Sequence, residues 1–237
     1  IPYLLGIPIT YWISRIRRAV QEPHIAEAHR NTPASMAWSI DEFKTFLLKL
    51  VPVIVIGGFM ELCCYTLFMW FPSYLHHFLQ IDSSVAQLCN TIGFYAWIGF
   101  ILLAGYLSGR FGYKKIIMVH TLAMIILLFP LFKLAQLGTY SSLLTAYVLF
   151  AWLNSGVPAV MMEVLGDAFS TKRRALGMSM GQNLAATVFG GTAPWLNSVV
   201  IDYTGLSLFP AYYIIGMGIL VLPLISLLKP HNNQPIS

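Results

Sequence analysis

Residues 95–129 read YAWIGFILLAGYLSGRFGYKKIIMVHTLAMIILLF, and this stretch decides the fold. It consists of two apolar runs joined by a short segment that carries Arg110, Lys114 and Lys115. Both apolar runs extend beyond the quoted residues. Each is then long enough to cross the hydrocarbon core of a bilayer as a helix, which takes about 20 residues. The pattern is typical of two transmembrane helices joined by a basic turn.

The composition extends this interpretation to the whole chain. Of the 237 residues, 57% are hydrophobic and 10% are charged, whereas a soluble domain carries about a quarter charged residues. The mean hydropathy is +0.71. The basic residues stand in short gaps between apolar runs and form no basic surface of the kind that binds nucleic acid. We therefore expect the lipid bilayer to surround most of this chain, and we expect no nucleic-acid partner.

Apolar runs predict seven membrane spans, and the first of them, at the start of the chain, is short. Hydrocarbon offers no partners for backbone groups, so each span is expected to be a helix that satisfies its own. The predicted fold class is an all-α polytopic membrane protein. The spans cover about 1–13, 45–74, 85–108, 115–133, 141–165, 175–200 and 208–228.

The basic residues predict the orientation. Thirteen of the 14 Lys and Arg residues stand in alternate gaps, where the positive-inside rule places the cytoplasm. Lys133 is the exception. The thirteen are Arg15, Arg17, Arg18, Arg30, Lys44, Lys49, Arg110, Lys114, Lys115, Lys172, Arg173, Arg174 and Lys229. We therefore expect a cytoplasmic C-terminus.

These boundaries predict four parts. Residues 1–14 would end one helix, 15–44 would form a cytoplasmic central loop, 45–228 a six-helix bundle and 229–237 a cytoplasmic tail. The loop is compatible both with an amphipathic segment and with a solvated linker. Because the chain opens inside an apolar run, we expect further helices to precede it.

The segment Gly105–Lys115 reads GYLSGRFGYKK. It resembles the G-x-L-a-D-R-x-G-R-K loop between two spans of the major facilitator superfamily, with Gly109 in the place of the usual Asp. Gly105 would let helices approach closely, and Gly112 would permit a tight turn.

A second segment, Gly166–Gly177, reads GDAFSTKRRALG. It is similar to the E-L-F-P-T-x-x-R-x-x-G loop of the metabolite:proton symporters, with Ser170 in the place of Pro. Further similarities to that family are FPSYL at 71–75, GGTAP at 190–194 and PAYY at 210–213.

These motifs occur in the family's order, and they identify the chain as similar to the proline/betaine branch. The resemblance implies a bundle with part of helix 6 and helices 7–12 of a twelve-helix transporter in a bacterial inner membrane. It implies proton-coupled symport of a small zwitterion or carboxylate by alternating access, with an osmolyte such as proline or betaine favoured. The implied partners are the missing helices 1–5, the substrate and protons; no cofactor is implied.

Glu61 is the first candidate site residue, because it lies near the middle of the second span. An ionised carboxylate at that depth costs about 2.5–3.5 kcal/mol on insertion scales. We expect it to couple protons or bind a substrate ammonium; a structural hydrogen bond from a protonated carboxyl is the alternative.

Other polar or aromatic residues of the second, fifth and sixth spans are candidates to line a substrate cavity. Polar side chains also join membrane helices without a further role, so this alternative stays open. An aromatic ring could hold a quaternary ammonium by cation–π attraction. The candidates are Tyr65, Trp152, Asn154, Gln182 and Asn183.

The two motif segments supply a predicted cytoplasmic gating network, in which Asp167 pairs with cations in one state of the transporter. The alternative is that its cations only determine topology. The members are Gly105, Arg110, Gly112, Lys114, Asp167 and Arg174.

Three function classes compete. No zinc-protease, nucleophile-elbow or phosphate-loop motif is present, and the cysteines show no metal spacing, so we expect neither an enzyme nor a metal site. A truncated scaffold, or half of a split transporter inactive alone, is the alternative to a symporter. No Lys or Arg is expected at mid-membrane, which favours a zwitterionic substrate over a dicarboxylate unless the cation lies in the missing half.

Overall fold

The computed structural model describes residues 10–13, 15–16, 39–170 and 173–228. The chain divides into two units, Ile1–Ile40 and Asp41–Ser237. In the first unit, residues 10–13 and 15–16 are helical and exposed. The second unit contains the helices that carry the site.

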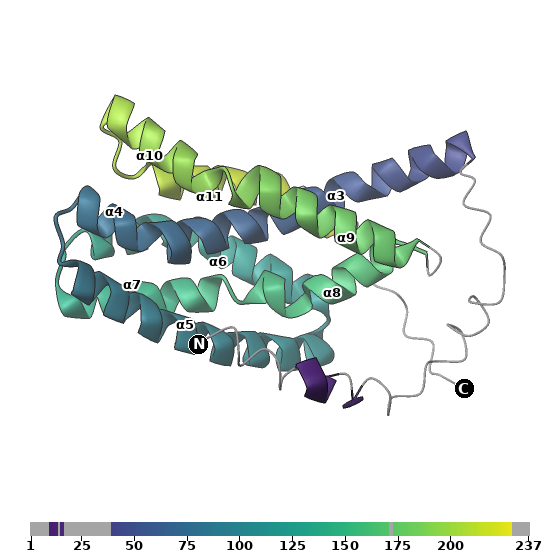
Figure 1. Ribbon diagram of the computed structural model, residues 1–237, viewed down its shortest axis with the longest axis horizontal. Helices are drawn as coiled ribbons and strands as arrows, with labels where there is room; N and C mark the ends of the chain where they lie inside the picture. The colour runs from purple at the N-terminus through teal and green to yellow at the C-terminus, as the bar shows by residue number, and fades with distance from the viewer. Residues whose placement is uncertain (1–9, 14, 17–38, 171–172, 229–237) are drawn as a thin grey trace. The chain divides into compact units, whose positions relative to one another are not determined.

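Six helical spans in the described residues are long and apolar enough to cross a membrane. Three of them are single helices: α5 (Ser83–Phe111), α6 (Tyr113–Ala135) and α11 (Phe209–Leu227). The others are built from consecutive segments (Figure 1). These are α3 (Ile40–Cys64), η2 (Tyr65–Trp70) and α4 (Phe71–His77); α7 (Tyr140–Leu153) and α8 (Gly156–Ala168); and α9 (Arg174–Ala185), η3 (Ala186–Gly190) and α10 (Ala193–Thr204).

The predicted all-α polytopic class is confirmed, and six of the seven predicted spans match these helices within about five residues. The remaining predicted span is the short run 1–13 at the start of the chain, and most of it lies outside the described residues. The largest difference is at the start of α3, which begins at Ile40 rather than near residue 45. Asp41 and Glu42 occupy its first turn, where acidic side chains interact favourably with the helix dipole.

Three spans depart from a regular α-helix in their interior. η2 and η3 are π-helical, a conformation that appears mostly as single turns and frequently at functional sites. The α7–α8 span breaks at Asn154 and Ser155. These irregularities matter because each changes which side chains face the neighbouring helices.

Within the second unit, α5 packs on α7, and α6 packs on α7, α8 and α11. α9 contacts α8, while α10 contacts η2 and α11 (Figure 1). The core is aromatic: the ring of Phe71 lies 5.0 Å from that of Phe132, 5.4 Å from Phe150 and 5.7 Å from Tyr147. In lipid such close van der Waals packing, rather than exclusion of water, holds helices together.

Large apolar side chains remain exposed along α5, as expected of a helix that contacts lipid or other membrane helices. Tyr95 and Leu102 are 73% and 70% exposed. Monomeric soluble proteins rarely leave large contiguous apolar surface uncovered. The exposed face and the span lengths together describe a multi-pass membrane protein.

Candidate functional site

Glu61 and Gln182 meet inside the bundle. The Gln182 Nε2 donates a hydrogen bond of 2.5 Å to Glu61 Oε1, joining α9 to α3. Both side chains are half-buried. The other amide atom, Gln182 Oε1, is buried and has no hydrogen-bond partner among the described residues. The pair therefore presents a carboxyl and an unused carbonyl oxygen, which suits a proton or a donor-bearing cation.

Tyr65 joins this pair through a close approach of the two spans. A Cβ placed on Gly190 would lie 3.0 Å from the Tyr65 ring and 3.3 Å from the Glu61 Cβ. Gly190, the last residue of η3, therefore lets the second π-helical segment lie against the first turn after Glu61. Three predicted site residues, Glu61, Tyr65 and Gln182, are thus brought to one place.

Polar contacts hold the π-helical segment η2 to its neighbours. Asn90 Nδ2 of α5 donates to the Phe68 carbonyl at 3.1 Å. Asn197 Nδ2 of α10 donates to Thr66 Oγ1 at 3.2 Å. Both asparagines are buried. The π-helical segment after Glu61 is therefore bonded to two flanking helices, once through its backbone and once through a side chain.

Sequence reasoning missed Asn90, Asn197 and Thr66 as contributors to this region. Their one available signal was their position inside apolar spans, where polar side chains are rare. That signal does not say which residue each would bond. The two π-helical segments had no sequence signal that we recognised.

Trp152 and Asn154 lie at the break between α7 and α8, and their contacts go to α5 and α6. The Asn154 carbonyl accepts from Trp97 Nε1 at 3.1 Å. The Trp152 and His120 rings are 5.6 Å apart. Asn154 Nδ2 is buried without a hydrogen-bond partner among the described residues. These two candidates form a separate cluster at a helix break, and their role in a cavity stays a prediction.

Asn183 also stands apart from the Glu61 pair. Its side chain is exposed, and its Nδ2 donates to the Ser179 carbonyl of the same helix at 2.8 Å. Its predicted place in a cavity is untested by these contacts.

The predicted gating residues lie at the end of the bundle where α5, α6, α8 and α9 begin or end. Asp167 Oδ2 accepts a hydrogen bond of 3.0 Å from the Tyr113 hydroxyl. The Arg110 guanidinium lies 4.8 Å from the centre of the Tyr106 ring. Arg174 is exposed at the first position of α9. Among the described residues, Asp167 has no ion pair with Arg110 or Arg174, so the network stays a prediction for another state.

The neighbouring residue Arg173 forms an ion pair with Glu42 at 3.8 Å. This contact ties the start of α3 to the loop before α9. It was missed because the sequence motif pointed to the next arginine. The Glu42 side chain is 61% exposed and the Arg173 side chain 17%.

The structure confirms the prediction for Gly112 but not the one for Gly105. Gly112 lies between α5 and α6 with a φ of 84°, which residues other than glycine rarely adopt, so the predicted tight turn is confirmed. The prediction of a close helix approach at Gly105 is wrong for this structure. A Cβ there would meet no atom of the described residues within 4 Å, because the flank of α5 at this position is uncovered.

Lys114 has a definite structural contact. Its ammonium donates to the carbonyls of Ser226 and Leu228, the latter at 3.1 Å. These carbonyls end α11, where the helix dipole favours a cation. Lys114 therefore fastens the C-terminal end of α11 to the start of α6.

The chain has clear relatives among known proteins. Residues 32–236 match the family model of the Major Facilitator Superfamily. A protein named putative proline/betaine transporter from Staphylococcus haemolyticus is 26% identical over 225 residues, covering 93% of this chain and 47% of the relative. The citrate-proton symporter of Klebsiella pneumoniae is 26% identical over 222 residues, 90% of this chain and 48% of the relative.

A third relative, the ectoine/proline transporter of Corynebacterium glutamicum, is 26% identical over 226 residues, 90% of this chain and 45% of the relative. The chain thus spans about half the length of the curated relatives it matches. The predicted similarity to proline/betaine transporters is confirmed by the first of these names, and the third also names a proline transporter. Because the family match covers most of the chain, the chain belongs to the major facilitator superfamily.

Proposed function

We propose that this chain forms the second half of a secondary transporter that carries a small metabolite together with protons by alternating access. A zwitterionic osmolyte such as proline or betaine is the favoured substrate, and a carboxylate such as citrate is the next. Relatives over nearly the whole chain are named as transporters of proline/betaine, ectoine/proline and citrate with protons. In this family type, two bundles rock about a site near the membrane midplane.

The observation that carries the proposal is the hydrogen bond between Gln182 and Glu61. Both residues lie inside apolar spans, where an ionisable group is costly and marks a functional site by default. The unused Gln182 carbonyl and the Glu61 carboxyl are both acceptors when the carboxyl is ionised. A proton, or the ammonium group of a zwitterion, would relieve that electrostatic cost.

Proton coupling would follow from the same cost. Within the membrane a protonated Glu61 is neutral, whereas an ionised one carries the penalty unless a cation is bound. Loading a proton together with substrate would therefore lower the barrier to rocking. Both would then be released on the other side, and the empty transporter would return to its starting state.

The charge distribution favours a zwitterion over a dicarboxylate. In the described spans, the Lys and Arg residues lie toward the ends, and all except Lys133 are next to the basic gaps. A dicarboxylate site needs cations near the substrate, since buried charges are paired. Such a cation would have to come from the preceding helices of the complete transporter.

We propose the orientation given by the positive-inside rule, with the basic gaps and the C-terminus in the cytoplasm of a bacterial cell. On this arrangement the turn at Gly112 faces inward, and the turns at Asp82 and Gly205 face outward.

The test is uptake by proteoliposomes that hold the complete transporter containing this chain. Radiolabelled proline, betaine and citrate are compared with and without an inward proton gradient. We expect accumulation of one zwitterion, driven by the gradient and abolished by a protonophore. Uptake that ignores the gradient would contradict proton coupling, and transport of none of these compounds would contradict the substrate class.

A second candidate is half of a split transporter, or a scaffold, with no transport alone. The observation in its favour is that the chain covers only 45–48% of its relatives. Expressing the chain together with a separate N-terminal half distinguishes a split transporter from a scaffold. Restored uptake favours the split transporter, and assembly without uptake favours the scaffold.

A further inference from the structure

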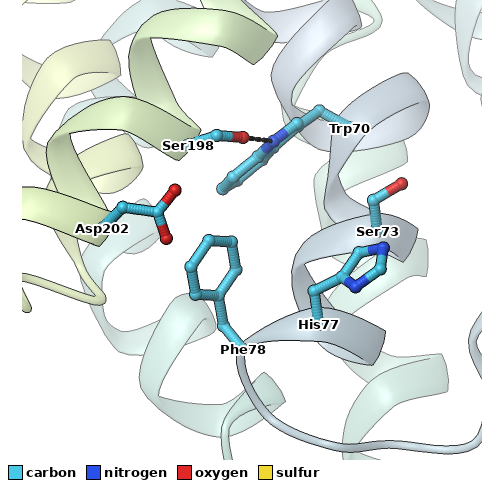
Figure 2. Close-up of a pocket in the computed structure, with 6 residues that line it drawn as sticks. All are labelled: Trp70, Ser73, His77, Phe78, Ser198 and Asp202. Carbon is cyan, nitrogen blue, oxygen red and sulfur yellow. Dashed lines mark hydrogen bonds between the residues drawn. The ribbon is translucent and has the colours of Figure 1, made fainter.

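A pocket of about 370 Å³ lies between the η2–α4 segment and α10, at one end of the bundle. Its lining residues are Trp70, Ser73, His77, Phe78, Ser198 and Asp202. Figure 2 shows Trp70, Phe78 and Asp202 facing one another across this space, with Ser73 and His77 lining it from α4. The pocket is separate from the Glu61 pair: Trp70 is nine positions after Glu61, which corresponds to about 13 Å along an α-helix.

The Trp70 indole is held in place on two sides. Its Nε1 donates to Ser198 Oγ at 2.8 Å, and its ring stacks on Tyr74 with centres 5.2 Å apart. The Phe78 ring stands 6.5 Å from the indole at an angle of 45°. The two rings therefore form a preformed aromatic corner that needs no rearrangement to receive a ligand.

Asp202 supplies a negative charge to this corner. Its side chain is exposed, and among the described residues it has neither a hydrogen-bond partner nor an ion-pair partner. An aromatic face attracts a cation within about 6 Å, and the carboxylate attracts the same charge. Both the aromatic rings and the Asp202 carboxylate therefore favour a positively charged ligand in this pocket.

The aromatic rings indicate which kind of cation uses the whole pocket. A primary ammonium has three donors, and its partners here would be the Asp202 carboxylate and the remaining lone pair of Ser198 Oγ. That hydroxyl accepts from Trp70 and donates to the Pro194 carbonyl at 3.0 Å. A methylated ammonium needs no such acceptors and offers apolar surface to the rings. This is the chemistry by which aromatic sites recognise quaternary ammonium groups.

We propose that this pocket binds a small cation bearing a methylated ammonium group, through Trp70, Phe78 and Asp202. On the proposed orientation it opens toward the cell exterior. The proposal concerns binding alone and does not require that the chain transport anything.

The test is titration of the full chain in lipid nanodiscs with tetramethylammonium chloride, read by calorimetry. Ammonium chloride is the reference for charge without methyl groups. We expect saturable binding of tetramethylammonium and weaker binding of ammonium. Absence of saturable binding, or equal binding of both cations, overturns the proposal.

Variants then assign the site. Asp202→Asn should weaken tetramethylammonium binding by about fivefold, the upper range for an exposed charge pair. Asp41→Asn makes the same chemical change away from the pocket and should leave affinity unchanged. Phe78→Leu should weaken binding by about threefold, whereas Phe78→Tyr keeps an aromatic face and should retain it.

One result of this series decides the proposal: equal affinities of Asp202→Asn and the unaltered chain would overturn it. Tetramethylammonium binding is measured without a proton gradient and without transport, so failure of the transport proposal and failure of this one give different patterns.

Discussion

The side-chain amide of Gln182 donates a 2.5 Å hydrogen bond to the carboxyl of Glu61, a residue 121 positions earlier. The contact joins two spans that each change from α-helix to π-helix within a few residues of it. Because π-helical turns add a residue to the helix, they reorient the side chains that follow. A polar contact placed beside two such turns can be made and broken by small helix movements.

Glu61→Gln is expected to abolish proton-driven accumulation in the complete transporter, because the amide has no proton to exchange. The measurement is substrate uptake into proteoliposomes across an imposed proton gradient. Glu163→Gln is the matched control: Glu163 is exposed on α8 and lies 3.5 Å from the Ser108 hydroxyl. Unchanged uptake and unchanged pH dependence in Glu61→Gln would refute the coupling role.

Gly177→Ala is expected to destabilise the bundle by about 1–3 kcal/mol, the usual effect of overpacking. A Cβ at Gly177 would lie 2.5 Å from the buried Phe169 ring, which also contacts the Phe46 ring at 5.2 Å. The measurement is the unfolding midpoint in detergent. Gly166→Ala, where nothing lies within 4 Å of the new methyl group, should not lower it. Equal midpoints for the two variants would contradict this packing.

Lys114→Met is expected to loosen the C-terminal turn of α11, since the carbonyls of Ser226 and Leu228 lose their cation. The effect should be about 0.3–1 kcal/mol, as for charges at helix ends. Hydrogen exchange of the last α11 amides measures it. Lys115→Met removes an exposed neighbouring charge and should leave exchange unaltered. Faster exchange in both variants would point to net charge as the cause.

Asp167→Asn is expected to shift the balance between inward-facing and outward-facing states of the complete transporter. Asp167 accepts from the Tyr113 hydroxyl, so it links α8 to α6 at the proposed cytoplasmic end. Asp167→Asn removes the charge and keeps an acceptor, whereas Tyr113→Phe removes the hydrogen bond without changing the charge, and each should shift the balance. Accessibility labelling of introduced cysteines measures the shift, and unchanged labelling in both variants would count against a gating role.

Acid is expected to weaken the start of α5. Hydrogen bonds from the Ser84 hydroxyl, and then from the backbone amides of Val85 and Ser84, lower the pKa of Asp82 below its ordinary value of 3.8. A lowered pKa in the folded state means that the stabilisation is present above pH 3.8 and is lost as pH falls through the folded value.

The measurement for Asp82 is hydrogen exchange of the Ser84 and Val85 amides as a function of pH, corrected for intrinsic exchange. Protection should fall below pH 3.8 in the unaltered chain. Asp82→Asn keeps an N-cap acceptor without a titratable group, so its protection should not change with pH. A pH response in that variant would assign the effect to another group.

Several features of the candidate site could be predicted from sequence, and the reason is local. Glu61 and Gln182 stand out because a polar residue in an apolar span is costly wherever it points. Gly112 stands out because a glycine next to cations between two spans indicates a turn, and its φ of 84° agrees. Each of these inferences uses only a residue and its immediate neighbours.

Pairings were harder to predict. The gating motif pointed to Arg174, yet among the described residues it is Arg173 that forms an ion pair, with Glu42. One position along a helix rotates a side chain by about 100°, so the choice between adjacent arginines depends on how α9 begins. Gly105 was expected to contact a neighbouring helix closely, but it lies on an uncovered side of α5. Its contacts also depend on the rotation of its helix, which the motif does not specify.

The sequence by itself determined the six described spans, their approximate ends and the family, because hydrocarbon requires long apolar helices whatever their partners. The tertiary structure alone decided that Gln182 donates to Glu61 and that Gly190 packs against the Tyr65 ring. It also decided that one pocket is lined by Trp70, Phe78 and Asp202. These contacts join residues from different spans. They depend on helix rotation and on the π-helical turns, and neither is specified by hydrophobicity along the chain.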